Sequence, residues 1–194
     1  MEQEISERFG RVHRAIHANG RDVLDRVLVT CDEMLRDRGC TRVVHHSLDA
    51  TGQFDPVMEG HGSCGGIRIY VHGEDKVGVK FARIIQERTE DRILSLIISV
   101  DGPTPFTKKE CNPKRVQFMT VRNLCVNVTR HSLVPKHEVV TNAPDGVSVD
   151  KLPPILDSDP IVQYYNWPAG TIVRVWRRFA GYEPVPYFRR VSSS

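Results

Sequence analysis

Two stretches of the sequence carry residue types that could do chemistry, and the first is the glycine-rich run Gly-Ser-Cys-Gly-Gly over 62–66. A phosphate-binding loop ends in Gly-Lys-Ser/Thr and leads into a helix, whose amino terminus holds the anion, but an alternating, strand-like segment follows here. A nucleophile elbow needs Gly-x-Ser-x-Gly spacing and a strand–turn–helix context, which are also missing. We therefore interpret 62–66 as part of a loop that extends over 49–66.

The second stretch could belong to a metal-dependent nuclease. Such enzymes place an aspartate ahead of an acid-x-lysine triplet on a strand, so that the carboxylates hold Mg²⁺ and the lysine helps to orient the attacking water. Asp55 and Lys80 fit two of these positions, but the acid position of the triplet is Gly78. Without that carboxylate the metal loses a hard oxygen ligand, so we expect no catalytic residue here.

The cysteines and histidines form no pattern typical of a metal site or a disulfide framework. The five cysteines are odd in number and no two have Cys-x-x-Cys spacing. His13 and His17 are spaced to share one face of an expected helix, but no third ligand lies nearby in the sequence. We therefore expect no metal and no cofactor, and free thiols fit a reducing compartment such as the cytosol or nucleus.

The elements that position these residues predict an α/β domain in the first part of the chain. Apolar residues are spaced along one helix face over 5–16, with Gly20 closing that helix. Thr30 and Glu33 spell a capping box for a short helix that ends at Gly39. Further patterns predict strands over 41–46, 67–71 and 94–100 and a helix over 79–91. The strand over 67–71, the helix over 79–91 and the strand over 94–100 follow one another along the chain, and this order indicates a βαβ-like unit.

After about residue 120 helix patterns become scarce and proline becomes frequent. Segments 125–128, 171–176 and 186–191 read as strands. Asp159-Pro160 predicts a helix start, because aspartate caps the first amide groups and proline suits the first helical position. We therefore expect two domains, an α/β domain over 1–120 and a small β-rich α+β domain over 121–194.

The net charge of +3 is distributed unevenly. Residues 1–120 hold 18 basic and 18 acidic side chains, whereas 121–194 hold 9 and 6. A basic cluster is more commonly a solvated face than a polyanion site, so the excess does not by itself indicate DNA binding. No apolar run approaches the about 20 residues that cross a bilayer, and the amino terminus lacks the basic-then-apolar order of a secretory signal. We therefore expect no membrane partner.

The second domain carries a set of motifs in a fixed order. They are His131-Ser-Leu133-Val134-Pro135-Lys-His137, Leu152-Pro153, Asp159-Pro160, Tyr164, Gly170-Thr-Ile-Val-Arg174 and Tyr187-Phe-Arg-Arg-Val191. In order and spacing they resemble the assembly domain of the fifth-largest common subunit of eukaryotic RNA polymerases, which has a shorter archaeal counterpart. The resemblance covers roughly 121–194.

A fainter resemblance, at 29–30, 76–80 and 104–105, extends to the amino-terminal jaw domain of that family. That domain is similar in fold to restriction endonucleases but lacks the catalytic acids, which agrees with Gly78 in the triplet. The sequence departs from the family at 142–150, where a short turn-like segment replaces a longer acidic helix, and at Phe106 in the jaw loop. We therefore interpret the chain as a diverged copy.

The resemblance implies a non-catalytic structural subunit of a multisubunit DNA-dependent RNA polymerase, located in the nucleus. It would dock on the largest subunit, contact other polymerase subunits and line the path of downstream double-stranded DNA, with no cofactor. The implied DNA-contact residues are Thr104, Pro105, Thr107, Lys108 and Lys109. The implied assembly residues are His131, Leu133, Val134, Pro135, His137, Asp159, Pro160, Tyr164, Gly170 and Arg174.

Several alternatives remain open at this point. The chain could be a free-standing DNA-binding or adaptor protein, or, with less support, the metal-dependent nuclease considered above. Polymerases I, II and III are all compatible with the motifs, as is a viral transcription complex, and membership of polymerase I would place the protein in the nucleolus. The apolar and aromatic assembly residues could equally be ordinary core.

Overall fold

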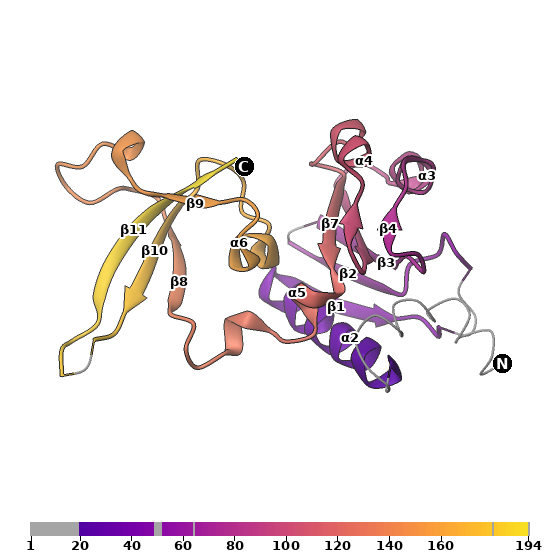
Figure 1. Ribbon diagram of the computed structural model, residues 1–194, viewed down its shortest axis with the longest axis horizontal. Helices are drawn as coiled ribbons and strands as arrows, with labels where there is room; N and C mark the ends of the chain where they lie inside the picture. The colour runs from indigo at the N-terminus through magenta and orange to yellow at the C-terminus, as the bar shows by residue number, and fades with distance from the viewer. Residues whose placement is uncertain (1–19, 49–51, 64, 180, 194) are drawn as a thin grey trace. The chain divides into compact units, whose positions relative to one another are not determined.

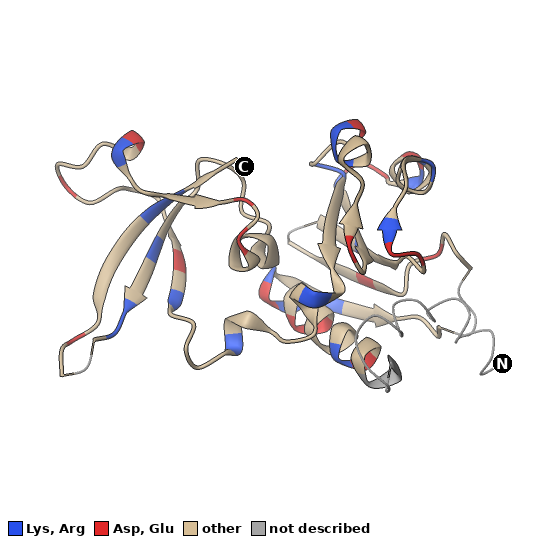
Figure 2. Cartoon of the chain, viewed as in Figure 1, with Lys and Arg blue, Asp and Glu red and all other residues tan. Residues whose placement is uncertain are grey.

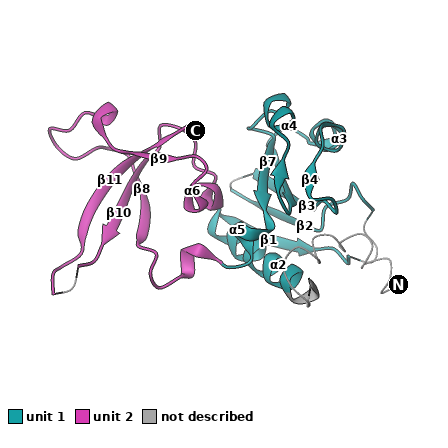
Figure 3. Ribbon diagram, in the orientation of Figure 1, with its two compact units in different colours: residues 1–126 teal, residues 127–194 magenta. Residues whose placement is uncertain are grey.

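The computed structural model describes residues 20–48, 52–63, 65–179 and 181–193 (Figure 1). The chain divides into two compact units, residues 1–126 and residues 127–194 (Figure 3). This division lies a few residues beyond the expected boundary at 120. The helix expected over 5–16 lies outside the described residues.

Unit 1 is built on a five-stranded mixed sheet with the order β1-β2-β3-β5-β7. The strands are β1 (Cys40–His45), β2 (Met58–Gly62), β3 (Gly65–Val71), β5 (Ile93–Ser99) and β7 (Val116–Thr120). β1, β2 and β3 are antiparallel, whereas β3, β5 and β7 are parallel. Leu96, Ile97 and Ile98 of β5 are all fully buried, as expected for a parallel strand covered on both faces. A separate parallel pair joins β4 (Lys76–Val77) and β6 (Gly102–Pro103).

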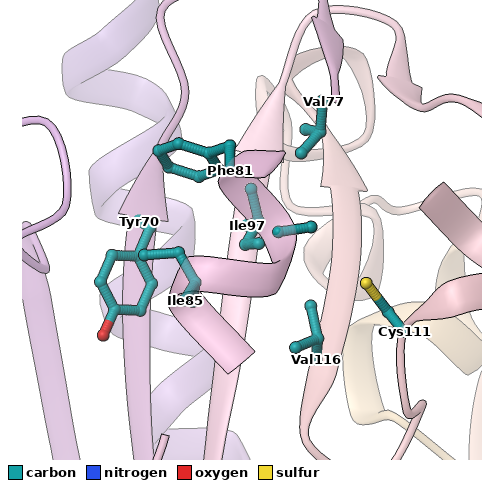
Figure 4. Close-up of a cluster of buried hydrophobic side chains, with 8 residues drawn as sticks. Tyr70, Val77, Phe81, Ile85, Ile97, Cys111 and Val116 are labelled. Atoms are coloured by element: carbon teal, nitrogen blue, oxygen red, sulfur yellow. The ribbon is translucent and has the colours of Figure 1, made fainter. Parts of the chain in front are cut away.

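Helices cover both faces of this sheet. On one face α3 (Val79–Arg88) packs Phe81 and Ile85 against Ile97 and its neighbours (Figure 4). α4 (Pro105–Glu110) lies next to α3. The strand register places His45, Met58, Ile69 and Leu96 side by side on the other face. There α2 (Gly20–Asp37) contacts β1 and α5 (Val121–Leu124), and Asp32 of α2 bonds His45.

Two expectations for unit 1 are wrong. Thr30 does not start a helix but lies buried inside α2, ten residues after Gly20, the first described residue of that helix. The buried positions Val23, Leu24, Val27, Cys31, Met34 and Leu35 form one continuous helix face, and the packing of that face outweighs the local capping signal.

The segment 49–66 is not all loop, because it contains β2 and the start of β3. Four of its five glycines lie in β2 and β3, where they allow close approach of neighbouring backbone. A Cβ atom at Gly62 would collide with the backbone carbonyl of Gly39, and one at Gly60 would meet the thiol of Cys40. The glycine-rich composition of this segment, which is typical of a loop, therefore reflects close packing between neighbouring strands.

Unit 2 is a four-stranded sheet in the order β8-β10-β11-β9 with one short helix. Its elements are η1 (Val128–Arg130), β8 (Lys136–Val140), η2 (Val149–Lys151), β9 (Pro154–Leu156), α6 (Pro160–Tyr165), β10 (Ile172–Arg177) and β11 (Val185–Ser192). A core of Ile155, Val162, Val173, Val175 and Val191 joins the sheet to α6.

The helix start predicted at Asp159-Pro160 is confirmed. The Asp159 carboxylate accepts a hydrogen bond of 2.8 Å from the backbone N–H of Ile161, and Pro160 is the first residue of α6. The strand expected over 125–128 is wrong. The chain forms α5 and then η1 in this region, and the Asn127 side chain caps η1 by accepting from the backbone N–H of Thr129.

Candidate functional site

Two hollows open on the surface of unit 2. The larger hollow, of about 1140 Å³, is bordered by residues 131–136, by the same face of β8 and β10, and by the turn between β10 and β11. The smaller hollow, of about 480 Å³, lies between residues 134–137, the start of α6 and strands β10 and β11. Val134 and Pro135 line both hollows, so the segment before β8 forms the ridge between them.

Most of the expected assembly residues gather at these two hollows. The larger hollow is lined by His131, Leu133, Val134, Pro135 and Arg174. The smaller hollow is lined by Val134, Pro135, His137, Asp159 and Pro160. The fold therefore brings residues from 131 to 174 onto one continuous surface of unit 2, which we call the assembly surface.

Leu133 is the most exposed apolar side chain of this surface. Its side chain is 85% exposed. The turn that presents it is held by His131, whose ring nitrogen Nδ1 accepts from the backbone N–H of Leu133 at 3.2 Å and whose carbonyl accepts from that of Val134 at 3.0 Å. Burying this leucine against a partner would remove apolar area from water without unfolding anything in unit 2.

Glu138 is the electrostatic centre of the larger hollow. The β8–β10 register places it opposite Arg174, whose Nη2 and Nε donate to Glu138 Oε2 at 2.8 and 3.1 Å. Trp176 Nε1 donates to the same oxygen at 2.8 Å, and Lys136 pairs with the other. These donors, first Lys136, then Trp176 and Arg174, lower the pKa of Glu138 to about 2. The carboxylate therefore stays ionised and fixes Arg174 in place.

Sequence reasoning did not single out Glu138. The usable signal was that Arg174 and Trp176 are two residues apart on an expected strand, so their side chains share one face. No strand was expected around Glu138. Only the register decides that Glu138 meets these two residues.

Two expected assembly residues do not line either hollow. Tyr164 is only 1% exposed, and its hydroxyl accepts from the side-chain amide of Asn127 at 3.1 Å. Gly170 has a φ of +92°, a conformation that favours glycine, and its N–H donates to the carbonyl of Val191. Both residues therefore stabilise the fold of unit 2 and do not form part of the assembly surface.

His137 and Asp159 lie in the smaller hollow with structural partners of their own. His137 Nδ1 lies 2.7 Å from the carbonyl oxygen of Pro135, and burial lowers the pKa of this histidine. Asp159 caps α6. These bonds fix the ridge and the helix start that border the smaller hollow.

The expected DNA-contact residues form the start and body of α4 in unit 1. Thr104 caps the helix, with Pro105 at its first position, and the Thr104 and Thr107 hydroxyls lie 2.8 Å apart. Thr107 is fully buried, and its hydroxyl donates to the carbonyl of Val77 at 3.0 Å, so it holds the turn instead of facing solvent. Lys108 and Lys109 are exposed and form no ion pair with any residue that the structure describes.

The nuclease-like triplet does not lie on a strand. Gly78 precedes α3 as its N-cap, and Lys80 is an exposed residue in the first turn of that helix. Asp55 accepts a 2.7 Å hydrogen bond from the backbone N–H of Gly52. In the described ranges, no three His, Cys, Asp or Glu side chains are grouped so that they could hold a metal ion. In the same ranges, no helix is long and apolar enough to cross a bilayer.

Comparison with known proteins relates this surface to a defined family. Residues 126–191 match the family model described as RNA polymerase Rpb5, C-terminal domain. Unit 2 is therefore similar to the carboxyl-terminal domain of Rpb5. The chain as a whole is Rpb5-like, because its similarity to curated proteins continues into unit 1.

Three relatives show how far the similarity reaches. The RPABC1 subunit of DNA-directed RNA polymerases I, II and III from Caenorhabditis briggsae is 25% identical over 188 residues, covering 86% of this chain and 83% of the relative. The Caenorhabditis elegans protein of the same name is 26% identical over 122 residues, 56% of this chain and 58% of the relative. The Dictyostelium discoideum protein of the same name is 30% identical over 128 residues, 56% of this chain and 64% of the relative. The last two matches span less than two thirds of those relatives.

Replacing Glu138 by glutamine should change how strongly the stability of unit 2 depends on acid pH. The folded-state pKa of Glu138 is lowered from its usual value near 4.5 to about 2, so the carboxylate contributes stability that is present above about pH 4.5 and is lost as pH falls towards 2. Thermal melting of Glu138→Gln should therefore show a flatter pH dependence than wild type between about pH 5 and 2. Glu183→Gln, which removes an exposed carboxylate of the same unit, is the control and should keep the wild-type slope. If the melting temperature of Glu138→Gln depended on pH as steeply as that of wild type, the stabilising role of the bonds from Lys136, Trp176 and Arg174 to Glu138 would be contradicted.

Proposed function

We propose that this protein is a non-catalytic structural subunit of a multisubunit DNA-dependent RNA polymerase. The observation that carries the proposal is that unit 2 is similar to the carboxyl-terminal domain of Rpb5 and has eight of the ten expected docking residues gathered at its two hollows. The relatives are themselves named as polymerase subunits. A nuclear location follows from this proposal.

The assembly surface is the part of the chain that docks on the largest polymerase subunit. Exposed Leu133 provides apolar contact area, and the hollows on either side of the ridge can accept side chains of the partner. Standard interfaces combine such an apolar centre with a polar rim. The ion pairs around Glu138 supply that rim on one side.

Unit 1 acts as a jaw that lines the path of downstream DNA, with a fold similar to restriction endonucleases and no catalytic acid at Gly78. Its mixed sheet with helices on both faces is compatible with that fold. The exposed lysines of α4 supply positive charge for phosphate contacts, which hold a duplex without reading its sequence (Figure 2).

Affinity purification of the tagged full-length chain, followed by mass spectrometry, tests the main proposal. We expect the two large subunits of one nuclear polymerase in stoichiometric amounts, and their identity names the polymerase. Recovery of the chain alone, or with unrelated DNA-binding proteins only, would favour the free-standing adaptor instead. Incubation of the pure protein with Mg²⁺ and DNA should give no cleavage.

Reversing the two lysine charges of α4 should weaken the grip on downstream DNA. Lys108→Glu/Lys109→Glu adds repulsion where two exposed cations stand, so the polymerase should release a downstream duplex faster at low salt and show a flatter salt dependence. The measurement is the lifetime of stalled elongation complexes at increasing salt. The control is Lys151→Glu, an exposed lysine in unit 2. Equal lifetimes for the double variant and wild type at every salt concentration would contradict a contact between α4 and downstream DNA.

A further inference from the structure

The larger hollow carries an excess of positive charge. It is lined by Lys136, Arg174, Arg177 and Arg178, against the two carboxylates of Glu138 and Glu183. Figure 2 shows the lysine and arginine positions on β8 and β10 in blue.

The carboxylate of Glu138 is already fully engaged by its neighbours. Arg174 and Trp176 donate to one of its oxygens and Lys136 pairs with the other. Two of the four cations that line the hollow, Lys136 and Arg174, are therefore paired with Glu138. The remaining positive charge lies on Arg177 and Arg178.

These two arginines are available to a ligand. Arg177 lies over the ring of Tyr187, with its guanidinium carbon 4.9 Å from the ring centroid, which orients the group but leaves its N–H donors free to bind. Both arginines are exposed, and neither forms an ion pair with a residue in the described parts of the chain. A guanidinium of this kind pairs well with carboxylates in two-pronged geometry.

Apolar side chains flank the same hollow. Leu133, which is 85% exposed, and Phe179, which is 49% exposed, both line it. A ligand that fits must therefore combine negative charge with apolar groups. A continuous phosphate backbone offers no apolar group to these two side chains.

We propose that the larger hollow binds an acidic segment of a protein partner, whose carboxylates pair with Arg177 and Arg178 while its apolar side chains pack against Leu133 and Phe179. This inference rests on the proposed function, since within a polymerase the segment belongs to the docking subunit. It names the chemistry of that contact, which the match to the family does not.

The test compares charge variants of the tagged full-length chain in affinity purification at stepwise increasing salt. Arg177→Glu/Arg178→Glu should recover at least about tenfold less of the large polymerase subunits than wild type at low salt, with a flatter salt dependence. Arg178→Glu alone leaves the contact of Arg177 with Tyr187 intact and should show the same trend with a smaller loss. Lys151→Glu, outside both hollows, should behave like wild type. Melting curves of all variants confirm that unit 2 is folded.

A second arm uses the pure protein and two labelled probes, a glutamate-rich peptide with interspersed leucines and a single-stranded oligonucleotide of equal length. We expect the peptide to bind wild type more tightly than the double variant. Tighter binding of the oligonucleotide than of the peptide, lost in the double variant, would overturn the proposal in favour of nucleic acid. Polymerase recovery that is equal for wild type and double variant at all salt concentrations would overturn it and leave the proposed function standing. Failure of wild type itself to recover polymerase would instead contradict the proposed function.

Discussion

Replacing Leu133 by aspartate is expected to lower recovery of the large polymerase subunits about thirtyfold or more. An apolar side chain that is buried at the centre of an interface typically contributes about 2 kcal/mol or more to binding, and a charge in its place adds a desolvation cost. Leu133 is 85% exposed in the free chain and lines the larger hollow next to the ridge, so a docked partner would bury it. The measurement is quantitative mass spectrometry of affinity-purified complexes.

The same exposure makes this variant a clean test. Since Leu133 has no place in the core of unit 2, the melting temperature of Leu133→Asp should match that of wild type. Val147→Asp is the matched control, because Val147 is an exposed apolar residue of the same unit outside both hollows. Full recovery of polymerase by Leu133→Asp, or an equal loss with Val147→Asp, would mean that the ridge is not the docking site.

Replacing Ile97 by alanine is expected to destabilise unit 1 by about 2–5 kcal/mol, the usual cost of deleting buried methyl groups and leaving a cavity. Ile97 is fully buried on β5, which lies between β3 and β7 in the sheet, among Tyr70, Phe81, Ile85 and Val116 (Figure 4). Neighbouring side chains come from β3, α3 and β7, so the space cannot close without shifting several elements.

Thermal unfolding measures this effect, and the transition of unit 1 should move down by roughly 10 °C. Val29→Ala is the control, because Val29 of α2 is 60% exposed and its truncation should leave the transition nearly unchanged. A shift for Ile97→Ala no larger than that for Val29→Ala would contradict the burial of Ile97 between the sheet and α3.

Local signals in the sequence were reliable where the chemistry is confined to adjacent residues. The Asp159-Pro160 helix start is such a case, since the cap forms between Asp159 and the amide of Ile161. The alternating pattern of 67–71 and the apolar run of 94–100 correspond to β3 and β5. Local signals failed where distant packing decides, as at Thr30 inside α2 and at Gly60 and Gly62 in β2.

The sequence by itself predicted a two-domain organisation, several of the strands and the ordered motifs that resemble one polymerase subunit family. It supplied the assembly residues as a set of separate motifs, but it did not say which of them face solvent. Only the tertiary structure decided that Leu133 is exposed while Tyr164 and Thr107 are buried, and that Glu138 meets Arg174 and Trp176 across two strands. The physical reason is that exposure and strand register depend on contacts between residues far apart in the chain, which a local pattern does not encode.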